Sequence, residues 1–402
     1  MENTHTKPKI RFPGFTDPWE QRKFSDFALR ESSIRLSSSE YPSVEYEDVV
    51  AEEGRLNKDV RLKETQKTGI VFEGSQVLYG KLRPYLHNWL NPDFTGVAVG
   101  DWWVLRPIGM NKKFLYRLIQ TQRFDDVANQ SSGSKMPRAD WNLVSNTEFI
   151  IPSSLDEQRQ IAEIFDSLDN LIALQQYKLN ALREYRKGLL QKMFPRDGAS
   201  TPEIRFPGFT DPWEQRKFGD DIENIQTGTN LLGSTTNQGM PLLKMGNIQR
   251  GYFDVSKLEY LEDKDTIEPE NIVYYGDFFF NTRNTLELVG KGATWTGESG
   301  KYAFNSNIAR FKLRDIDTVF FNYLYNTVAV TKQIHARAMG TTSVAAIYPW
   351  TLDTVTYYLP TIEEQKQIGL YFNRLDNLIT LHQREIDAMK EYKKGLLQQM
   401  FV

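Results

Sequence analysis

Apolar side chains recur every three or four residues along two long stretches of the chain, a spacing typical of amphipathic α-helices. The stretches cover residues 156–194 and 363–401, and neither contains a proline. Each helix would be about 57 Å long at 1.5 Å per residue. One apolar stripe on such a helix needs a partner, so we expect an antiparallel pair of the two helices, or else packing of each on its own domain. The residues expected at the pairing face are Ile161, Phe165, Leu168, Ile172, Leu179, Leu182 and Leu189, with Ile368, Phe372, Leu375, Ile379, Ile386, Met389 and Leu396.

The two helical stretches are copies of each other. They align without a gap at an offset of 207 residues, and 22 of the 39 positions are identical. A second repeat, IRFPGFTDPWEQRKF, occupies residues 10–24 and recurs unchanged at 204–218. The inserts between these repeats, about 25–150 and 219–358, share little resemblance. A common frame around two unlike inserts indicates that the frame performs one task twice and the inserts perform two different tasks.

The inserts contain aromatic and β-branched runs broken by Gly, Pro and Asn, which are typical of strands. Short helices are expected at 111–124 and 317–332. The predicted fold class is α+β, with two mixed domains, two long antiparallel coiled-coil-like helices and an internal pseudo-two-fold duplication. The predicted segments are 1–155 (opener and first mixed domain), 156–194 (first helix), 195–203 (Pro/Gly/Ser-rich linker), 204–362 (second opener and mixed domain) and 363–402 (second helix).

Composition narrows the possible chemistry. The 402 residues include no cysteine, which excludes disulfides, thiolate zinc sites and thiol catalysis, and the four histidines are too scattered to suggest a metal site. A net charge of −3 argues against a surface covered in phosphate contacts but is compatible with a locally basic groove. No apolar run approaches the roughly 18 residues that span a membrane, and the first residues lack a secretory apolar region. We therefore expect a cytoplasmic protein.

Enzyme motifs are incomplete in this chain. The segment 297–302 lacks the glycine spacing of a phosphate-binding loop, and Asp93 interrupts an Asn-Pro-Pro-aromatic motif of the adenine methyltransferase type at 91–94. Glu391 and Lys393 resemble part of a nuclease motif, but they lie on the second helical stretch without a nearby aspartate, and a solvated helix face explains them. No catalytic residue, metal site or bound cofactor is therefore predicted.

Basic, amide and aromatic side chains cluster in loops that follow expected strands in both inserts. Arg, Lys and Asn are side chains that contact base edges and phosphates, although ordinary surface charge would explain any one of them. Their placement at strand ends favours binding. The candidate DNA-binding residues are Lys81, Arg83, Tyr85, Lys135 and Arg138 in the first insert and Lys244, Asn247, Arg250, Arg283, Asn284 and Lys291 in the second.

The order of these motifs resembles the specificity subunit of type I restriction–modification systems over essentially the whole chain. The resemblance rests on the Pro-Gly-x-x-x-Pro-Trp-Glu opener, Leu-Tyr-Gly-Lys-Leu-Arg-Pro-Tyr at 78–85, and the paired Glu-Gln and Leu-Asp-Asn-Leu-Ile motifs within 148–172 and 358–379. It implies a non-catalytic protein whose two target-recognition domains each read one half of a bipartite, asymmetric site in double-stranded DNA.

The same resemblance implies partners and cofactors. The helices would set the spacer and dock two modification subunits of an adenine-specific methyltransferase that bind S-adenosylmethionine, and restriction subunits would use ATP and Mg. The chain itself would bind none of these cofactors and no membrane. The alternative is a duplicated scaffold that holds two protein partners without touching DNA.

Overall fold

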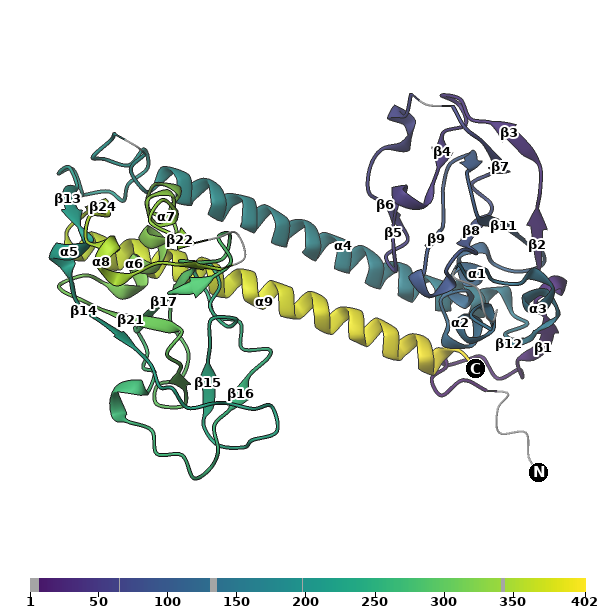
Figure 1. Cartoon of the computed structure of the whole chain (residues 1–402). Coiled ribbons are helices and arrows are strands. Elements are labelled where there is room, and N and C mark those ends of the chain that lie inside the picture. The colour runs from purple at the N-terminus through teal and green to yellow at the C-terminus, as the bar shows by residue number, and fades with distance from the viewer. Residues whose placement is uncertain (1–6, 65, 131–135, 197, 341–343) are drawn as a thin grey trace. The chain divides into compact units, whose positions relative to one another are not determined.

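The computed structural model describes residues 7–64, 66–130, 136–196, 198–340 and 344–402. The chain forms two compact units (Figure 1). Unit 1 comprises Met1–Gln176 and Arg384–Val402, and unit 2 comprises Tyr177–Gln383. Each unit has its own sheets and its own apolar core, so the predicted mixed helix-and-sheet fold class with a duplicated organisation is confirmed. Among the described residues, no helix is both long and apolar enough to cross a membrane.

Two long helices contribute to both units: α4 spans Leu155–Lys192 and α9 spans Ile362–Met400 (Figure 1). The start of α4 and the end of α9 belong to unit 1, whereas the end of α4 and the start of α9 belong to unit 2. Each unit is therefore built from the beginning of one long helix and the end of the other.

The helix segments run antiparallel inside each unit. In unit 1, Asp169 of α4 pairs with Lys393 of α9 at 2.6 Å, and the earlier residue Phe165 lies against the later residue Phe401. In unit 2, Arg186 of α4 pairs with Asp376 of α9. Asp376 is equivalent to Asp169 and Arg186 to Lys393, so the cation lies on α4 in unit 2 and on α9 in unit 1. The same ion-pair position is thus used twice, once in each direction.

The expected pairing-face residues are all buried or half-buried. Some join the apolar core of unit 1, others join that of unit 2, and the remainder are shielded near the middle of the helices. The unit 1 core contains Ile161, Phe165 and Leu396 with Leu168 at its edge, and the unit 2 core contains Leu189, Ile368, Phe372 and Leu375 with Leu182 and Ile379 at its edge. Leu179 and Ile386 are fully buried, and Ile172 and Met389 are half-buried.

Unit 1 contains two four-stranded sheets, ordered β3-β7-β10-β4 and β2-β11-β8-β9. Their facing aromatic and β-branched side chains, including Trp102 and Phe72, form a small core of their own. The strands are β1 Glu20–Lys23, β2 Ala28–Glu31, β3 Ile34–Leu36, β4 Ser43–Val44, β5 Val49–Val50, β6 Arg55–Leu56, β7 Thr68–Phe72, β8 Val77–Gly80, β9 Trp89–Leu90, β10 Gly96–Ala98, β11 Trp102–Pro107 and β12 Glu148–Ile151.

Unit 2 repeats the larger part of this arrangement, with a sheet ordered β14-β21-β17-β19 and two three-stranded sheets, β16-β15-β20 and β18-β23-β22. The parallel pair β4–β10 of unit 1 has its counterpart in the parallel pair β15–β20. The strands are β13 Glu214–Lys217, β14 Ile222–Thr227, β15 Pro241–Leu243, β16 Glu259–Tyr260, β17 Phe278–Asn281, β18 Arg283–Asn284, β19 Gly292–Thr294, β20 Ala303–Phe304, β21 Ile308–Leu313, β22 Met339–Gly340, β23 Ala345–Ala346 and β24 Thr356–Leu359.

Each of the two expected short helices is in fact a pair of helices. Thr121 and Thr327 separate the members of each pair, because each threonine side chain accepts a backbone N–H and caps the following helix. The pairs are α1 Lys112–Leu118 with α2 Gln122–Ala128 and α6 Thr318–Tyr325 with α7 Val328–His335. The other short helices are α3 Trp141–Asn146, α5 Phe218–Asp221 and α8 Pro349–Leu352.

The repeated opener is tied to its long helix in the same way in both units. Arg11 makes a bidentate ion pair with the buried Glu157, and Arg205 does the same with the buried Glu364. The strand that follows the opener then pairs with the strand that precedes the long helix, β1 with β12 and β13 with β24. This frame holds each insert at the start of a long helix.

Candidate nucleic-acid interface

In unit 1 the turn that follows β8 collects three of the predicted basic residues. Lys81 begins the turn, and its backbone carbonyl accepts the N–H of Ala139, so the segment before α3 lies alongside it. Asp101, just before β11, holds Arg138 through two bonds of 3.2 and 3.0 Å and lies 3.5 Å from the Lys81 ammonium. Arg138 and Lys81 lower the pKa of the Asp101 carboxyl. Asp101 thus brings together Lys81 and Arg138, which lie in separate segments of the sequence.

Arg83 adopts a left-handed backbone conformation with φ of 49°, which is unusual for a residue with a side chain. Its N–H donates to Pro137 O at 2.7 Å, and its Nε is buried without a hydrogen-bond partner among the described residues. Tyr85, two residues on, is exposed. Outlying backbone conformations persist where the surroundings impose them and cluster at functional sites. With Lys81, Arg138 and Asp101, Arg83 gives the turn a net charge of +2.

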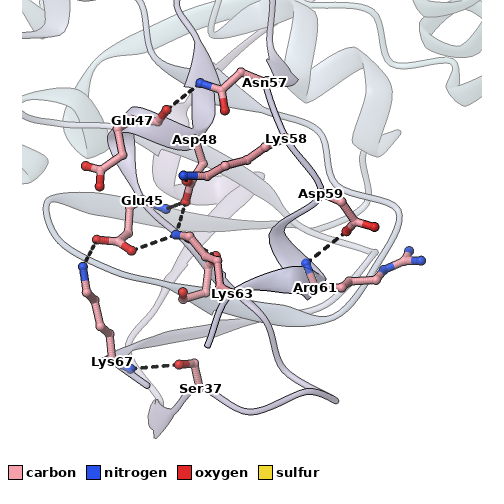
Figure 2. A network of polar contacts seen from close by, with 11 residues as sticks. Ser37, Glu45, Glu47, Asp48, Asn57, Lys58, Asp59, Arg61, Lys63 and Lys67 are labelled. Carbon is pink, nitrogen blue, oxygen red and sulfur yellow. Dashed lines mark hydrogen bonds and ion pairs between the residues drawn. The ribbon is translucent and has the colours of Figure 1, made fainter. Parts of the chain in front are cut away.

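A cluster of charged side chains fixes the neighbouring loop of unit 1. Lys63 lies between two carboxylates (Figure 2). It is 2.7 Å from Glu45 and also bonds to Asp48, which is fully buried. Lys58 approaches Asp48 at 2.8 Å, and Lys67 bonds to Glu45. Although burial opposes ionisation, these lysines lower the pKa of both carboxyls. The loop carrying the three lysines is thereby held against the end of β4.

Unit 2 places a corresponding turn after β17. The carbonyl of Thr282 accepts the N–H of Ile347, as that of Lys81 accepts Ala139 in unit 1, which makes the two turns structurally equivalent. Arg283 is exposed on β18 and pairs in the sheet with Ala346, and Asn284 is half-buried with its side-chain oxygen bonded to the N–H of Thr285. The equivalent turns therefore present different side chains.

Arg250 and Lys291 lie on separate segments of unit 2 and come together through Gln249. The Lys291 ammonium donates to Gln249 Oε1 at 2.7 Å, and Arg250 Nη2 donates to the Glu287 carbonyl at 3.2 Å and approaches His335 Nε2 at 3.1 Å. Burial, followed by the nearby Arg250 charge, lowers the pKa of Lys291. Among the described residues, no carboxylate forms an ion pair with either cation.

Two of the predicted DNA-binding residues in unit 2, Lys244 and Asn247, have partners within the chain. Both carboxylate oxygens of Glu259 bind the Lys244 ammonium at 2.9 Å. The buried Asn247 accepts the N–H of Lys244 and donates to two backbone carbonyls, so its whole amide is used in holding its own loop. We therefore leave Lys244 and Asn247 out of the interface. Lys135 lies outside the described residues.

Potential metal-ligating side chains do not gather into one group in the described part of the chain. No group of three or more His, Asp or Glu side chains there is arranged to hold a metal ion. Lys393 departs from the expectation of a solvated helix face, because it is largely buried and paired with Asp169 between the helices. The sequence missed this pairing because Asp169 lies more than 200 positions earlier in the chain.

The long helices also carry apolar side chains that face solvent, and these recur at equivalent positions in the two units. In unit 2, a groove of about 430 Å³ is lined by Tyr177, Leu182, Tyr185, Leu378 and His382, among others. The exposed fractions of the equivalent residues are 43% for Leu171 and 40% for Leu378, 50% for Leu174 and 53% for Leu381, and 52% for Tyr185 and 61% for Tyr392. Contiguous exposed apolar patches are common at interaction surfaces.

Comparison with known proteins places these features in a family. The family model for the type I restriction modification DNA specificity domain matches twice, at residues 17–184 and 210–391. The chain is 29% identical over 198 residues to the putative type I restriction enzyme MjaX specificity subunit of Methanocaldococcus jannaschii, covering 47% of this chain and 45% of that protein. It is 24% identical over 286 residues to the MjaVIII specificity subunit of the same organism, covering 67% and 65% respectively. The matches thus span about half to two thirds of these relatives.

The fold is also shared with solved structures. An S subunit of a type I restriction-modification system from M. genitalium superposes with a TM-score of 0.61 at 13% identity, covering 98% of this chain and 99% of that one. A chain from a structure of complex assembly and conformational transition in a type I R-M system gives a TM-score of 0.56 at 17% identity, covering 97% and 98%. Since the family model matches both halves, the chain belongs to the type I restriction–modification DNA specificity family.

Proposed function

We propose that this chain is the non-catalytic specificity subunit of a type I restriction–modification complex, and that each unit reads one half of a bipartite, asymmetric site in double-stranded DNA. The observation that carries the proposal is the pair of equivalent turns after β8 and β17. At matching positions, unit 1 has Lys81, Arg83 and Arg138, and unit 2 has Thr282, Asn284 and Ala346. One backbone arrangement with different side chains suits the reading of two different base sequences.

In unit 1, Arg83 and Tyr85 are the side chains of the turn that we assign to the DNA, whereas Asp101 orients Lys81 and Arg138. In unit 2 we assign to the DNA Asn284, at the position of Arg83, and its exposed neighbour Arg283. An arginine that contacts a guanine edge contributes about 1 to 3 kcal/mol of discrimination. Substituting Arg83 should therefore relax the sequence at one position of one half-site.

The repeated apolar side chains on α4 and α9 suit two copies of one partner. Leu174 and Tyr392 in unit 1 correspond to Leu381 and Tyr185 in unit 2, so the same partner surface could bind twice. We assign these surfaces to two modification subunits of an adenine-specific methyltransferase. Those modification subunits would bind S-adenosylmethionine, and restriction subunits would use ATP and Mg.

The proposal is tested by methyl transfer from labelled S-adenosylmethionine to DNA. The purified chain should transfer no methyl group, the modification subunits alone should lack sequence specificity, and the mixture should methylate one defined bipartite site. Methylation by the isolated chain at a rate unaffected by the partner would contradict it. A mixture that assembles but never binds DNA would favour the rival scaffold.

The docking surfaces have their own test. Leu381→Ser should remove one of two modification subunits from the assembled complex, as measured by its mass in sedimentation, and Leu174→Ser should remove the other. Leu62→Ser is the control, because Leu62 is also an exposed leucine but belongs to neither long helix. Full assembly with both helix positions changed would rule out these surfaces.

A further inference from the structure

Arg250 and Lys291 of unit 2 are adjacent cations, and no described carboxylate forms an ion pair with either of them, in contrast to several other cations of that unit. Lys312 pairs with Glu223, Lys264 with Glu262, Lys244 with Glu259 and Arg310 with Asp277. The hydrogen bonds of the Arg250 guanidinium and the Lys291 ammonium go to neutral groups, namely the Glu287 carbonyl, His335 and Gln249, and the Glu287 carboxylate acts on Lys291 without forming an ion pair. Two adjacent positive charges held in this way repel each other and favour an anion.

Hydrogen bonds hold the Arg250 and Lys291 side chains in place and leave donors available for a ligand. Arg250 Nη2 makes both of the arginine's hydrogen bonds, while no described residue bonds to its Nε or Nη1. A backbone bond to Val289 helps hold the His335 ring, which burial and the Arg250 charge keep in its neutral form by lowering its pKa. A neutral imidazole can accept the Arg250 hydrogen bond, so His335 orients the guanidinium.

Unit 1 lacks this cluster at the equivalent place. Asp48 and Asn247 are equivalent, because each side chain accepts the backbone N–H of the residue three positions earlier. Counting three positions onward, Ala51 of unit 1 corresponds to Arg250 of unit 2. The N–H of Gly80 bonds to Asn88 O as that of Asn281 bonds to Lys291 O, so Asn88 corresponds to Lys291. Both unit 1 residues are uncharged. The cation pair is therefore a feature of unit 2 alone.

We propose that Arg250 and Lys291 each bind a backbone phosphate of DNA and that His335 is the positioning residue for Arg250. This inference rests on the proposed function and adds an asymmetry to it. Unit 2 would make sequence-independent phosphate contacts beside its half-site, and unit 1 has no equivalent pair of cations. Phosphate contacts position a protein on the duplex without reading sequence.

The test is the salt dependence of DNA binding by the chain assembled with its modification subunits. In the variant Arg250→Gln/Lys291→Gln, the slope of log K against log salt should decrease by about two, because each phosphate contact contributes about 0.9. Between 50 and 200 mM salt, the wild type should lose about tenfold more affinity than the variant. Binding at low salt should weaken for every duplex, and the methylated sequence should stay the same.

Lys264→Gln/Lys312→Gln is the matched control, because it removes the same charge from unit 2 at ion-paired, exposed lysines and should leave the slope nearly unchanged. His335→Leu should reduce the slope by up to one, and His335→Gln, which retains an acceptor, should restore it. Thermal unfolding confirms that each variant is folded.

A wild-type slope in the folded double variant would overturn the phosphate site, and so would a changed methylated sequence, which would mean that the residues read bases. A wild-type slope in His335→Leu would remove the positioning role. A wild-type complex without sequence-specific binding would instead contradict the proposed function, so the two failures are distinguishable.

Discussion

A Glu-Gln pair at the start of each long helix connects the opener, the insert and the helix. Glu157 is 1% exposed and binds Arg11 of the opener, while its neighbour Gln158 accepts the N–H of Asn111 at the start of α1 and donates to Pro152 O. Glu364 and Gln365 repeat these contacts with Arg205, Asp317 and Pro360. The recurrence of the motif therefore has a structural cause, because both side chains join the same three parts in each unit.

Replacing Glu157 by glutamine should destabilise unit 1 by about 3 kcal/mol, the lower end of the range for breaking a buried ion pair. Denaturant unfolding measures this loss. Glu364→Gln should have a smaller effect in unit 2, because Trp19 Nε1 also donates to Glu157 whereas Trp213 Nε1 has no partner among the described residues. The control is Glu163→Gln, at an exposed position of α4. Equal stability of Glu157→Gln and the control would contradict this assignment.

The charged cluster of Figure 2 predicts a pH dependence. The pKa values of Glu45 and Asp48 are lower in the folded protein than in the unfolded chain, so the unfolded chain binds more protons near pH 4. The stability they contribute is present above that pH and is lost as the pH falls through the folded pKa values. The free energy of unfolding of Asp48→Asn should therefore vary less between pH 5 and pH 3 than that of the wild type. Parallel curves for the two proteins would refute this explanation.

Individual binding residues were harder to predict from the sequence than the turns that carry them. Lys81 and Arg138 come from separate segments and both contact Asp101, whereas the Asn247 amide donates to the Asp254 and Lys257 carbonyls. Whether an asparagine faces solvent or caps its own loop depends on contacts that no local pattern contains. The same applies to Asp101 and His335, whose partners are distant in sequence.

Long helices are the elements that the sequence predicts best, because their apolar stripe is repeated over many turns. The structure starts and ends each of them within two residues of the predicted limits. The short helices were less well predicted, since Thr121 and Thr327 act as caps that periodicity does not register. Ion pairs between the helices, such as Arg186 with Asp376, were also not predicted, because they require knowledge of the register.

The Arg186–Asp376 pair can be tested by charge reversal. Arg186→Asp should destabilise unit 2 by about 1 kcal/mol, since both side chains are partly exposed. Tyr323 also donates to Asp376 at 2.9 Å, so the carboxylate is fixed in place. Arg186→Asp combined with Asp376→Arg should recover part of the loss in a double-mutant cycle. Additive effects of the two changes would show that the pair contributes no coupling.

The duplication implies that residues 1–199 contain both surfaces needed to pair two long helices. In unit 1, Phe401 of α9 packs on Phe165 of α4 and Phe114 of α1, and in unit 2, Phe194 of α4 takes the equivalent place against Phe372 and Phe320. A second copy of residues 1–199 could therefore supply Phe194 where Phe401 now lies. Its Arg186 would likewise meet Asp169.

We expect a fragment ending at residue 199 to form a two-fold dimer that, with modification subunits, methylates the first half-site and its inverted repeat. Sedimentation and methylome mapping of the fragment measure both properties. Imperfect equivalences such as Ile164 with Tyr371 should make this dimer less stable than the natural pairing. A folded monomer, or a dimer that methylates the original asymmetric site, would show that the halves are not equivalent.

The most direct measurement of the central claim, that each unit reads its own half-site, is methylome sequencing of cells in which residues 25–150 are replaced by the insert of a related protein. The frame at 10–24 and both long helices stay unchanged, so assembly with the modification subunits should be retained. We predict that one half of the methylated sequence changes while the other half stays the same. Alteration of both halves, or of neither, would contradict the account.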